Sequence, residues 1–125
     1  MRSARGLQVV DRGHDPSVAP MLAAMELLGQ RWILRVIWEL QSGGPLGFLE
    51  LRRRMGNCSS SMLSERLQQL AAAEVVTKNA TGAWELTAIG AQLAGALCTV
   101  WDWSKCWRSR PPQAKREHPA RGTAD

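Results

Sequence analysis

The sequence has few of the residues on which most enzymes and metalloproteins depend. It contains two histidines, His14 and His118, and three cysteines, Cys58, Cys98 and Cys106, with no C-x-x-C pair. Because both histidines lie in the flanking segments, the body of the chain offers no Ser-His-Asp or Cys-His pair for catalysis. The number and spacing of the cysteines argue against a disulfide framework and against a zinc site. We therefore predict no enzyme activity, no metal site and no cofactor.

Long apolar runs are also missing from the sequence. No stretch reaches the roughly 18 residues that a membrane-crossing helix needs. The N-terminal residues lack the apolar segment of a secretion signal. We therefore predict a cytoplasmic protein with no membrane partner. Its 125 residues are enough for one domain with its own hydrophobic core.

The net charge of +5 is compatible with a nucleic-acid partner, but the position of the charge limits what it establishes. Between residues 20 and 107 there are eight Lys or Arg and seven Asp or Glu, whereas residues 105–125 carry six bases and two acids. The excess positive charge therefore lies mainly in the tails. We predict a flexible basic arm at residues 1–14 and a disordered basic tail at residues 109–125. The folded domain is expected at residues 15–108.

Apolar residues recur at helical spacing in five segments. The predicted helices span residues 15–28, 31–41, 47–55, 59–73 and 88–107. Asp15 is the expected N-cap of the first helix. Before the last helix, a β-branched run at residues 75–78 and an alternating run at 84–86 flank a turn, which predicts a small β-hairpin. We assign the inward stripe of the last helix to Ile89, Leu93, Leu97 and Val100.

The order of these elements is the most informative feature of the sequence. Two short helices joined by a tight turn at Gly56–Asn57 form a helix-turn-helix, and the hairpin that follows forms a wing. The second helix of the pair carries Leu63, Leu67 and Leu70 on one face and short polar side chains on the other. Such a helix can pack on the body with its apolar face and enter a DNA major groove with its polar face. The sequence therefore predicts a mainly α-helical winged helix-turn-helix fold with a small β-hairpin wing.

Two groups of polar residues are candidate DNA contacts. The candidates on the second helix of the pair, at residues 59–73, are Ser59, Ser60, Ser61, Ser64, Glu65 and Gln68. The candidates for the phosphate backbone and the wing are Arg52, Arg53, Arg54, Lys78, Asn79 and Thr81. Glutamine can pair with adenine and serine with a base or a phosphate, whereas the carboxylate of Glu65 is tolerable only beside a cytosine amine or an Arg. The alternative for both groups is a solvated surface.

Tryptophan is unusually frequent, with six residues against one Phe and no Tyr. Trp32 and Trp84 are expected in the core. The other tryptophans are Trp38, Trp101, Trp103 and Trp107. They are candidates for a dimer interface on the last helix, the interpretation that we favour, or for a pocket that binds a flat aromatic ligand. The two roles are compatible because a ligand site can lie at a dimer seam.

Four stretches, in this order, resemble the HxlR-type branch of the winged-helix regulators, which is related to the MarR group. They are LLGQRW at residues 27–32, FLELR at 48–52, CSSSMLSERLQQL at 58–70 and ELTAIG at 85–90. The resemblance extends over residues 20–107. It implies a DNA-binding transcription regulator, more often a repressor, that forms a homodimer through its first and last helices. It also implies that residues 59–73 form the recognition helix.

The sequence departs from this family pattern in several places, among them Trp38, where the family tends to be polar. Ala19 stands where the family usually carries a cysteine before a proline, so thiol sensing through that residue is not available. Gly47 replaces a basic residue of the family, which removes one phosphate contact. The hairpin tip at residues 79–83 is shorter than usual, so the wing is expected to reach less of the minor groove.

These features predict a homodimeric regulator that binds double-stranded DNA at a pseudo-palindromic operator, with half-sites about one helical turn apart. One alternative is a winged-helix module that binds protein instead of DNA. The small net charge of the body, the short wing and Glu65 are compatible with that alternative. Another is a sensor of aromatic ligands with a Trp-lined pocket at the dimer seam.

Overall fold

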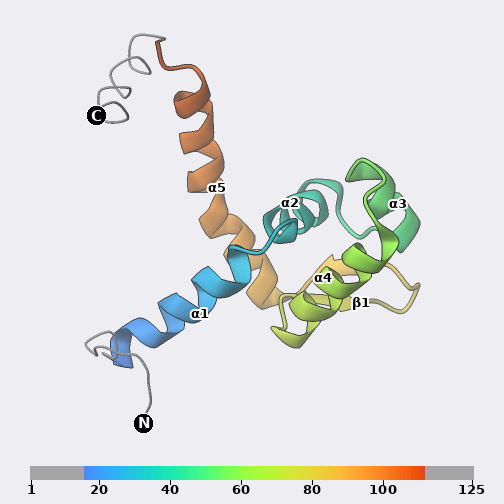
Figure 1. Cartoon of the computed structure of the whole chain (residues 1–125). Helices are drawn as coiled ribbons and strands as arrows, with labels where there is room; N and C mark the ends of the chain where they lie inside the picture. The colour runs from blue at the N-terminus through green and yellow to red at the C-terminus, as the bar shows by residue number, and fades with distance from the viewer. Residues whose placement is uncertain (1–15, 112–125) are drawn as a thin grey trace.

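The computed structural model describes residues 16–111, which form five α-helices, one short 3-10 helix and a two-stranded hairpin (Figure 1). In chain order the elements are η1 (Pro16–Val18), α1 (Ala19–Leu28), α2 (Ile33–Gly43), α3 (Phe48–Arg54), α4 (Ser60–Ala72), β1 (Val76–Lys78), β2 (Trp84–Leu86) and α5 (Ala88–Arg108). The predicted helices and hairpin are all present, with ends within a few residues of those expected. Asp15, the arm at residues 1–14 and most of the tail lie outside the described residues. Within residues 16–111 no helix combines the length and the apolarity that a membrane crossing requires.

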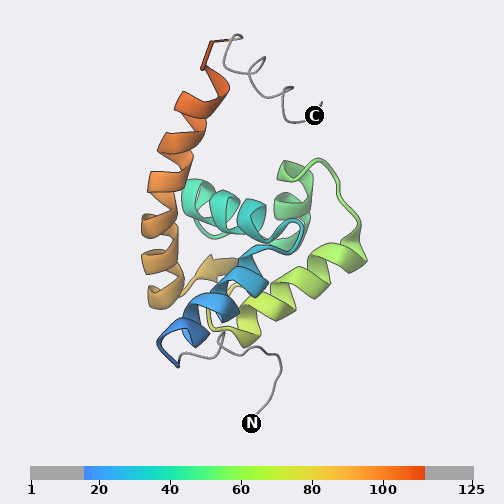
Figure 2. The same ribbon diagram turned by 60° about the vertical axis from the view of Figure 1, so that its left-hand side comes forward.

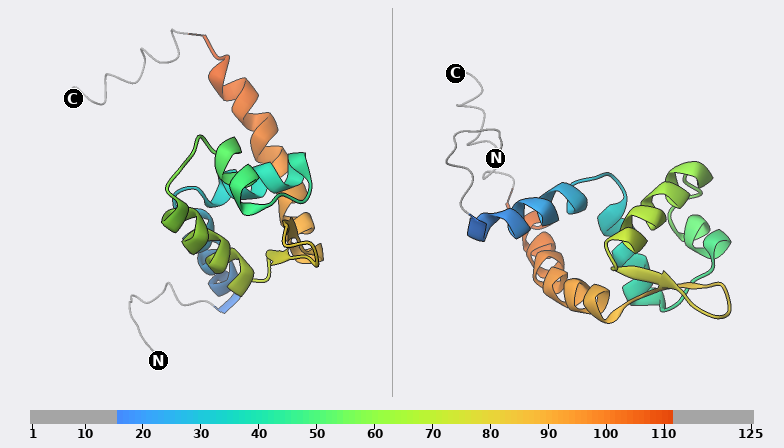
Figure 3. Two further views of the ribbon diagram at one scale, coloured as in Figure 1. Left: turned by 90° about the vertical axis from the view of Figure 1, so that its right-hand side faces the viewer. Right: turned by 90° about the horizontal axis from the view of Figure 1, so that it is seen from below.

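The helices divide between two sides of the molecule. α1 and α5 lie on one side, and α3, α4 and the hairpin lie on the other (Figure 1, Figure 3). The second half of α5 extends past the body (Figure 2). No residue of α1 is buried, and its apolar residues Met21, Leu22 and Met25 are 50%, 49% and 58% exposed. The apolar face of α1 is therefore largely uncovered within the described part of the chain.

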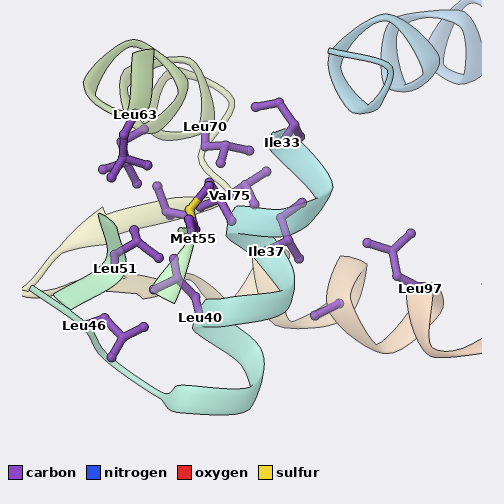
Figure 4. Close-up of a cluster of buried hydrophobic side chains, with 14 residues drawn as sticks. Ile33, Ile37, Leu40, Leu46, Leu51, Met55, Leu63, Leu70, Val75 and Leu97 are labelled. Carbon is purple, nitrogen blue, oxygen red and sulfur yellow. The ribbon is translucent and has the colours of Figure 1, made fainter. Parts of the chain in front are cut away.

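α2 forms the centre of the hydrophobic core (Figure 4). Ile33, Val36 and Ile37 have no exposed surface, because residues at this spacing share one face of a helix. The other buried apolar side chains are Leu40, Leu46, Leu51, Met55, Leu63, Leu67, Leu70, Val75, Val76, Ala94 and Leu97. Trp32 and Trp84, which were expected in the core, are half-buried and pack against it. Burial of each large aliphatic side chain contributes about 1.5–3 kcal/mol, so this core holds α4 and the hairpin in place.

The hairpin is joined to the body through Leu46, in the loop between α2 and α3. The Leu46 N–H donates to the Trp84 carbonyl oxygen at 3.0 Å, and the Trp84 N–H donates to the Leu46 carbonyl oxygen at 2.8 Å. β1 and β2 pair antiparallel in the register Val76↔Leu86, Thr77↔Glu85 and Lys78↔Trp84. The wing is therefore tied to the body by backbone hydrogen bonds as well as by side-chain packing.

The inward face of α5 differs from the predicted one. Gly90 and Leu97 are buried, whereas Ile89 and Val100 of the predicted stripe are 54% and 42% exposed. The reason is a close approach between α5 and the segment before β1: a Cβ on Gly90 would lie 2.0 Å from the Val75 carbonyl oxygen. Gly90, Ala94 and Leu97 therefore face the body, and Leu93 packs against the core beside them. The prediction was right for Leu93, which is half-buried against the core, and for Leu97, and it was wrong for Ile89 and Val100.

Candidate nucleic-acid interface

α4 presents an apolar face to the core and a polar face to solvent. Leu63, Leu67 and Leu70 are at most 1% exposed and hold the helix against the body. Of the six predicted recognition-helix residues, Ser64 is half-buried and the other five are exposed. Those five are Ser59, Ser60, Ser61, Glu65 and Gln68. The structure therefore leaves the polar side of α4 accessible.

A serine caps the start of α4. Ser59 Oγ accepts a hydrogen bond from the Met62 N–H at 3.3 Å and lies 3.1 Å from Ser61 Oγ. This cap satisfies one of the amide groups that have no partner inside the helix. The remaining amides and the helix dipole make the exposed start of α4 favourable for an anion such as a phosphate.

Arg52 holds the turn between α3 and α4. Its Nε donates to the Cys58 carbonyl oxygen, and its side chain is half-buried. Gly56 and Asn57 take φ angles of 77° and 58°, which allow the chain to reverse within two residues. The structure thus gives Arg52 a role in the turn that the run of three arginines did not indicate. Its predicted phosphate contact stays a prediction.

Arg53 and Arg54 share one carboxylate. Arg53 Nη2 donates to Glu50 Oε1, and Arg54 Nε donates to Glu50 Oε2 at 3.1 Å. The hydrogen bond from Arg53, followed by that from Arg54, holds the pKa of the Glu50 carboxyl below its usual value. The hydrogen bond between Glu50 and Arg53 also raises the pKa of Arg53. Glu50 is therefore ionised at neutral pH and offsets part of the positive charge of the predicted phosphate-binding cluster.

Two hydrogen bonds join α4 to the turn between α1 and α2. Arg66 Nε donates to the Arg31 carbonyl oxygen at 2.8 Å, and Gln69 Nε2 donates to Gln30 Oε1 at 2.9 Å. Trp32, in this turn, has a φ of 78°, a left-handed conformation that bulky residues seldom adopt. These contacts orient α4 and connect two of the family-like stretches. Gln30 and Gln69 were missed as positioning residues, because a glutamine paired with a distant residue shows no distinctive spacing.

The wing carries a positive charge on Lys78. Lys78 Nζ lies 5.2 Å from the centroid of the Trp84 ring, within the range of a cation–π contact. At the hairpin tip, Asn79 Oδ1 accepts hydrogen bonds from the Thr81 N–H at 3.0 Å and from Thr81 Oγ1 at 2.7 Å. Asn79 Nδ2 also donates to Glu85 Oε1 at 3.3 Å. The side chains of Asn79 and Thr81 therefore stabilise the tip, while Lys78 supplies the positive charge.

A hollow of about 340 Å³ lies between α4, the start of α3 and the wing. Its lining residues are Phe48, Ser64, Leu67, Gln68, Lys78, Gly82 and Trp84. It thus brings two predicted recognition-helix residues, Ser64 and Gln68, close to the wing lysine. A second hollow, of about 350 Å³, lies between the end of α4, β1 and the start of α5.

The four tryptophans predicted to line a pocket or an interface form two separate pairs. Trp38 and Trp101 meet edge to face with ring centroids 5.8 Å apart. Trp103 and Trp107 stack with centroids 5.5 Å apart and are 58% and 43% exposed. None of the four lines either of the two hollows described above. Their predicted roles, a dimer interface or an aromatic-ligand pocket at a dimer seam, stay predictions.

Comparisons with known proteins agree with this geometry. Residues 27–112 match the model of the HxlR-like helix-turn-helix family. The chain is 29% identical over 90 residues to YvaP of Bacillus subtilis, an uncharacterized HTH-type transcriptional regulator, a match that covers 67% of this chain and 82% of YvaP.

Solved structures give the same result. The crystal structure of quinone-bound YodB from B. subtilis is 31% identical, with a TM-score of 0.59, over 72% of this chain and 94% of that one. A possible HxlR family transcriptional factor from Thermoplasma volcanium shares the fold at 21% identity, with a TM-score of 0.62, over 69% of this chain and 82% of that one. The predicted winged helix-turn-helix fold is confirmed. Because the family model covers more than half of its length, this chain belongs to the HxlR-like helix-turn-helix family of transcriptional regulators.

Proposed function

We propose that this chain is a homodimeric repressor that binds a pseudo-palindromic operator through α4 of each copy. The observation that carries the proposal is the division of α4 into a face of buried leucines and an accessible face of short polar side chains. An α-helix fits the major groove of B-DNA, where polar side chains reach the base edges. α4 lies at the outer edge of the molecule, away from α5 (Figure 2).

The polar face of α4 has the chemistry for reading bases. Gln68 is exposed and can pair with adenine, and the hydroxyls of Ser61 and Ser64 can bond a base or a phosphate. Glu65 is 67% exposed at its side chain and lies 3.8 Å from Arg66 Nη1, which offsets part of its charge. Glu65 is therefore proposed to accept a hydrogen bond from a cytosine amine.

The proposed phosphate contacts come from the elements on either side of α4 in the chain. Arg53 and Arg54 are exposed on α3, and Lys78 is exposed on the wing. The first turn of α4, at Ser59 and Ser60, offers backbone amides to another phosphate. These contacts position the protein without reading sequence, and they make binding fall steeply as salt rises. The wing tip at residues 79–81 is proposed to lie beside the DNA backbone.

Dimerisation is proposed through α1 and α5, because these helices expose large apolar side chains. Met21, Leu22 and Met25 on α1, and Val100 and Trp103 on α5, are between 42% and 58% exposed. Clustered exposed apolar side chains mark protein interfaces in folded proteins. Since α1 and α5 lie on the side opposite α4, pairing through them leaves both recognition helices accessible (Figure 3).

DNA binding is tested by fluorescence anisotropy with the full chain and a labelled duplex from the region upstream of its own gene. We expect binding that weakens steeply with salt, and Gln68→Ala should weaken it about tenfold, the size of one lost base contact. Gln92→Ala, an exposed glutamine on α5, is the matched control and should leave binding unchanged. Absence of binding at low salt would refute the DNA proposal and favour the protein-binding module.

The dimer is tested by sedimentation velocity. Met25→Glu places a charge on the exposed apolar face of α1 and should produce monomers. Ala23→Glu adds the same charge to an exposed position on the other side of the helix and should leave the dimer intact. A wild-type chain that sediments as a monomer at every concentration would contradict the dimer.

Repression is proposed because a dimer bound at an operator blocks transcription by occupying the DNA, and it needs no additional surface for binding another protein. A reporter fused to the bound promoter should become more active when the gene is deleted, and less active again when it is restored. Loss of reporter activity on deletion would identify an activator instead.

A second proposed role is the sensing of a small aromatic molecule. YodB, at 31% identity, has been crystallised with a quinone bound, which supports a small-molecule trigger for this chain as well. The trigger proposed here does not use the family's usual cysteine, since that position is Ala19. Trp38 on α2 and the three tryptophans on α5 are the candidate contacts for a ligand at the dimer seam, and quenching of tryptophan fluorescence by planar compounds tests this role.

A further inference from the structure

The turn at residues 29–32 is fastened to the end of α1 (Figure 1). The Gly29 N–H donates to the Met25 carbonyl oxygen at 2.9 Å, and the Gln30 N–H donates to the Leu27 carbonyl oxygen at 3.3 Å. Because both bonds reach back into the last turns of the helix, the start of this turn has a fixed position relative to α1. It is a continuation of α1 and not a free linker.

A chain of side-chain hydrogen bonds runs from this turn to α4. Arg66 Nε donates to the Arg31 carbonyl oxygen at 2.8 Å, and Arg66 Nη1 donates to Gln69 Oε1 at 3.2 Å. Gln69 Nε2 in turn donates to Gln30 Oε1 at 2.9 Å. A guanidinium group can only donate, so the amide oxygen of Gln69 has to face Arg66 and its nitrogen has to face Gln30. The direction of each bond in the chain is therefore fixed.

These bonds supply the direction that the apolar packing of α4 lacks. Leu63, Leu67 and Leu70 bury one face of the helix, but hydrophobic contact is non-directional and constrains rotation of the helix about its axis weakly. A hydrogen bond requires its donor and acceptor to be aligned, and the charge of Arg66 strengthens the bonds that it makes. The Arg66 side chain is only 17% exposed, which limits competition from water. The chain of bonds therefore fixes the rotation of α4 relative to α1.

Backbone strain in the turn indicates that its conformation is held in place. Trp32 has a φ of 78°, and such left-handed conformations of bulky residues persist only where the surrounding contacts enforce them. The Arg31 guanidinium lies 5.1 Å from the centroid of the Trp32 ring, and the ring packs against the core. The carbonyl group of Arg31 accepts the bond from Arg66. The bond to α4 thus acts on the peptide group directly before the strained residue.

We infer that Gln30, Arg66 and Gln69 are positioning residues that set the half-site spacing that the dimer accepts. This inference rests on the proposed homodimer and on its proposed operator. If α1 lies in the dimer interface, the turn at its end is a fixed reference point in each copy, and α4 is bonded to that point. Without the bonds, α4 is free to rotate on its leucine face, and the dimer accepts a wider range of spacings.

The variants for the test separate the hydrogen bonds from the size of the side chains. Gln30→Leu keeps a side chain of similar size and removes the acceptor, whereas Gln30→Glu keeps an acceptor oxygen for Gln69 Nε2. Gln69→Glu removes the donor to Gln30 and still offers an acceptor to Arg66, so it breaks the chain at the same bond from the other side. Gln92→Leu, at an exposed position on α5, is the matched control.

The orientation of α4 is measured in the free full chain by residual dipolar couplings of the backbone N–H groups. In the wild type, Gln30→Glu and Gln92→Leu, the couplings of α2 and α4 should fit one rigid arrangement. In Gln30→Leu and Gln69→Glu, the couplings of α4 should be reduced relative to those of α2. Couplings of α4 that stay unchanged in both variants would overturn the positioning role. This measurement requires no DNA, so it decides the orientation of α4 even if the proposed DNA binding fails.

Half-site spacing is measured by selection from a pool of duplexes in which the two halves of the bound operator lie at varied separations. The wild type should prefer one spacing. Gln30→Leu and Gln69→Glu should lower this preference about fivefold, the equivalent of one hydrogen bond, and Gln30→Glu should keep it. An equal loss of affinity at every spacing would show that these side chains only stabilise the fold, and the inference would be wrong. Absence of binding by the wild type would instead refute the DNA proposal, and the spacing consequence with it.

Discussion

Replacement of Glu50 by glutamine is expected to strengthen DNA binding. Glu50 receives hydrogen bonds from Arg53 and from Arg54, and these bonds hold its pKa below the usual value. The carboxylate therefore stays ionised at any pH suitable for DNA binding. It keeps both guanidinium groups close to α3 and repels an approaching phosphate. Glu50→Gln removes this charge, and glutamine keeps the shape of the side chain and a similar helix propensity.

The size of the effect follows from counterion release. Each phosphate neutralised by a protein cation adds roughly 0.9 to the slope of log K against log salt. If the Glu50→Gln variant gains one phosphate contact, its slope should steepen by about this amount. At a salt concentration of about 0.15 M the same term corresponds to about fivefold tighter binding. Arg53 and Arg54 are both solvent-exposed, at 68% and 41% of their side chains, so the loss of their pairing with Glu50 should change the melting temperature little.

Fluorescence anisotropy with an operator duplex, over a salt series from about 0.05 to 0.3 M, measures both quantities. Asp102→Asn is the matched control, because it removes one negative charge from an exposed position on α5. A variant with unchanged affinity and slope would show that Glu50 does not restrain the arginines. An equal gain in the Asp102 variant would show that net charge alone is responsible.

Three further predictions concern the elements that position α4 and the wing. Leu67→Ala should lower the free energy of unfolding by about 2–5 kcal/mol, because this side chain is 1% exposed. Urea denaturation measures this change, and a loss below about 1 kcal/mol would contradict the packing of Leu67 in the core. Gly90→Ala should lower the free energy of unfolding by at least about 1–3 kcal/mol, because the added Cβ would lie 2.0 Å from the Val75 carbonyl oxygen. Gly95→Ala, on the same helix, places its Cβ in open space and should raise the free energy of unfolding by about 0.5–1 kcal/mol. Equal effects on the thermal unfolding of these two variants would count against the close approach. Thr87→Ala removes the cap that accepts the Gly90 N–H at 3.0 Å and should cost about 1 kcal/mol in the same assay.

The helix order and the two faces of α4 could be predicted because both depend on local spacing. Leucines at positions 63, 67 and 70 recur at the helical period, and the structure buries all three. The hairpin was predictable because a β-branched run and an alternating run flank a turn. The inward face of α5 was not predictable in the same way, since apolar residues occur on more than one side of that helix.

Side-chain partners far apart in sequence could not be predicted. The bond from Arg66 to the Arg31 carbonyl spans 35 residues, and the pairing of Gln69 with Gln30 spans 39.

The run of three arginines suggested one common role, yet Arg52 braces the turn before α4 while Arg53 and Arg54 share Glu50. Nor did the sequence indicate the hollow beside Trp84, because its lining residues come from α3, α4 and the wing.

By itself the sequence determined which segments become helices, where the hairpin lies, which leucines of α4 are buried and which family the chain resembles. These are properties of residue type and short-range spacing, and each depends on residues that lie close together in the sequence. The tertiary structure decided that Gly90 of α5 meets the body, that Arg66 bonds the turn before α2, and that Gln68 and Lys78 line one hollow. These outcomes depend on the close approach of backbones and side chains that are distant in sequence, and only the packed core brings them together.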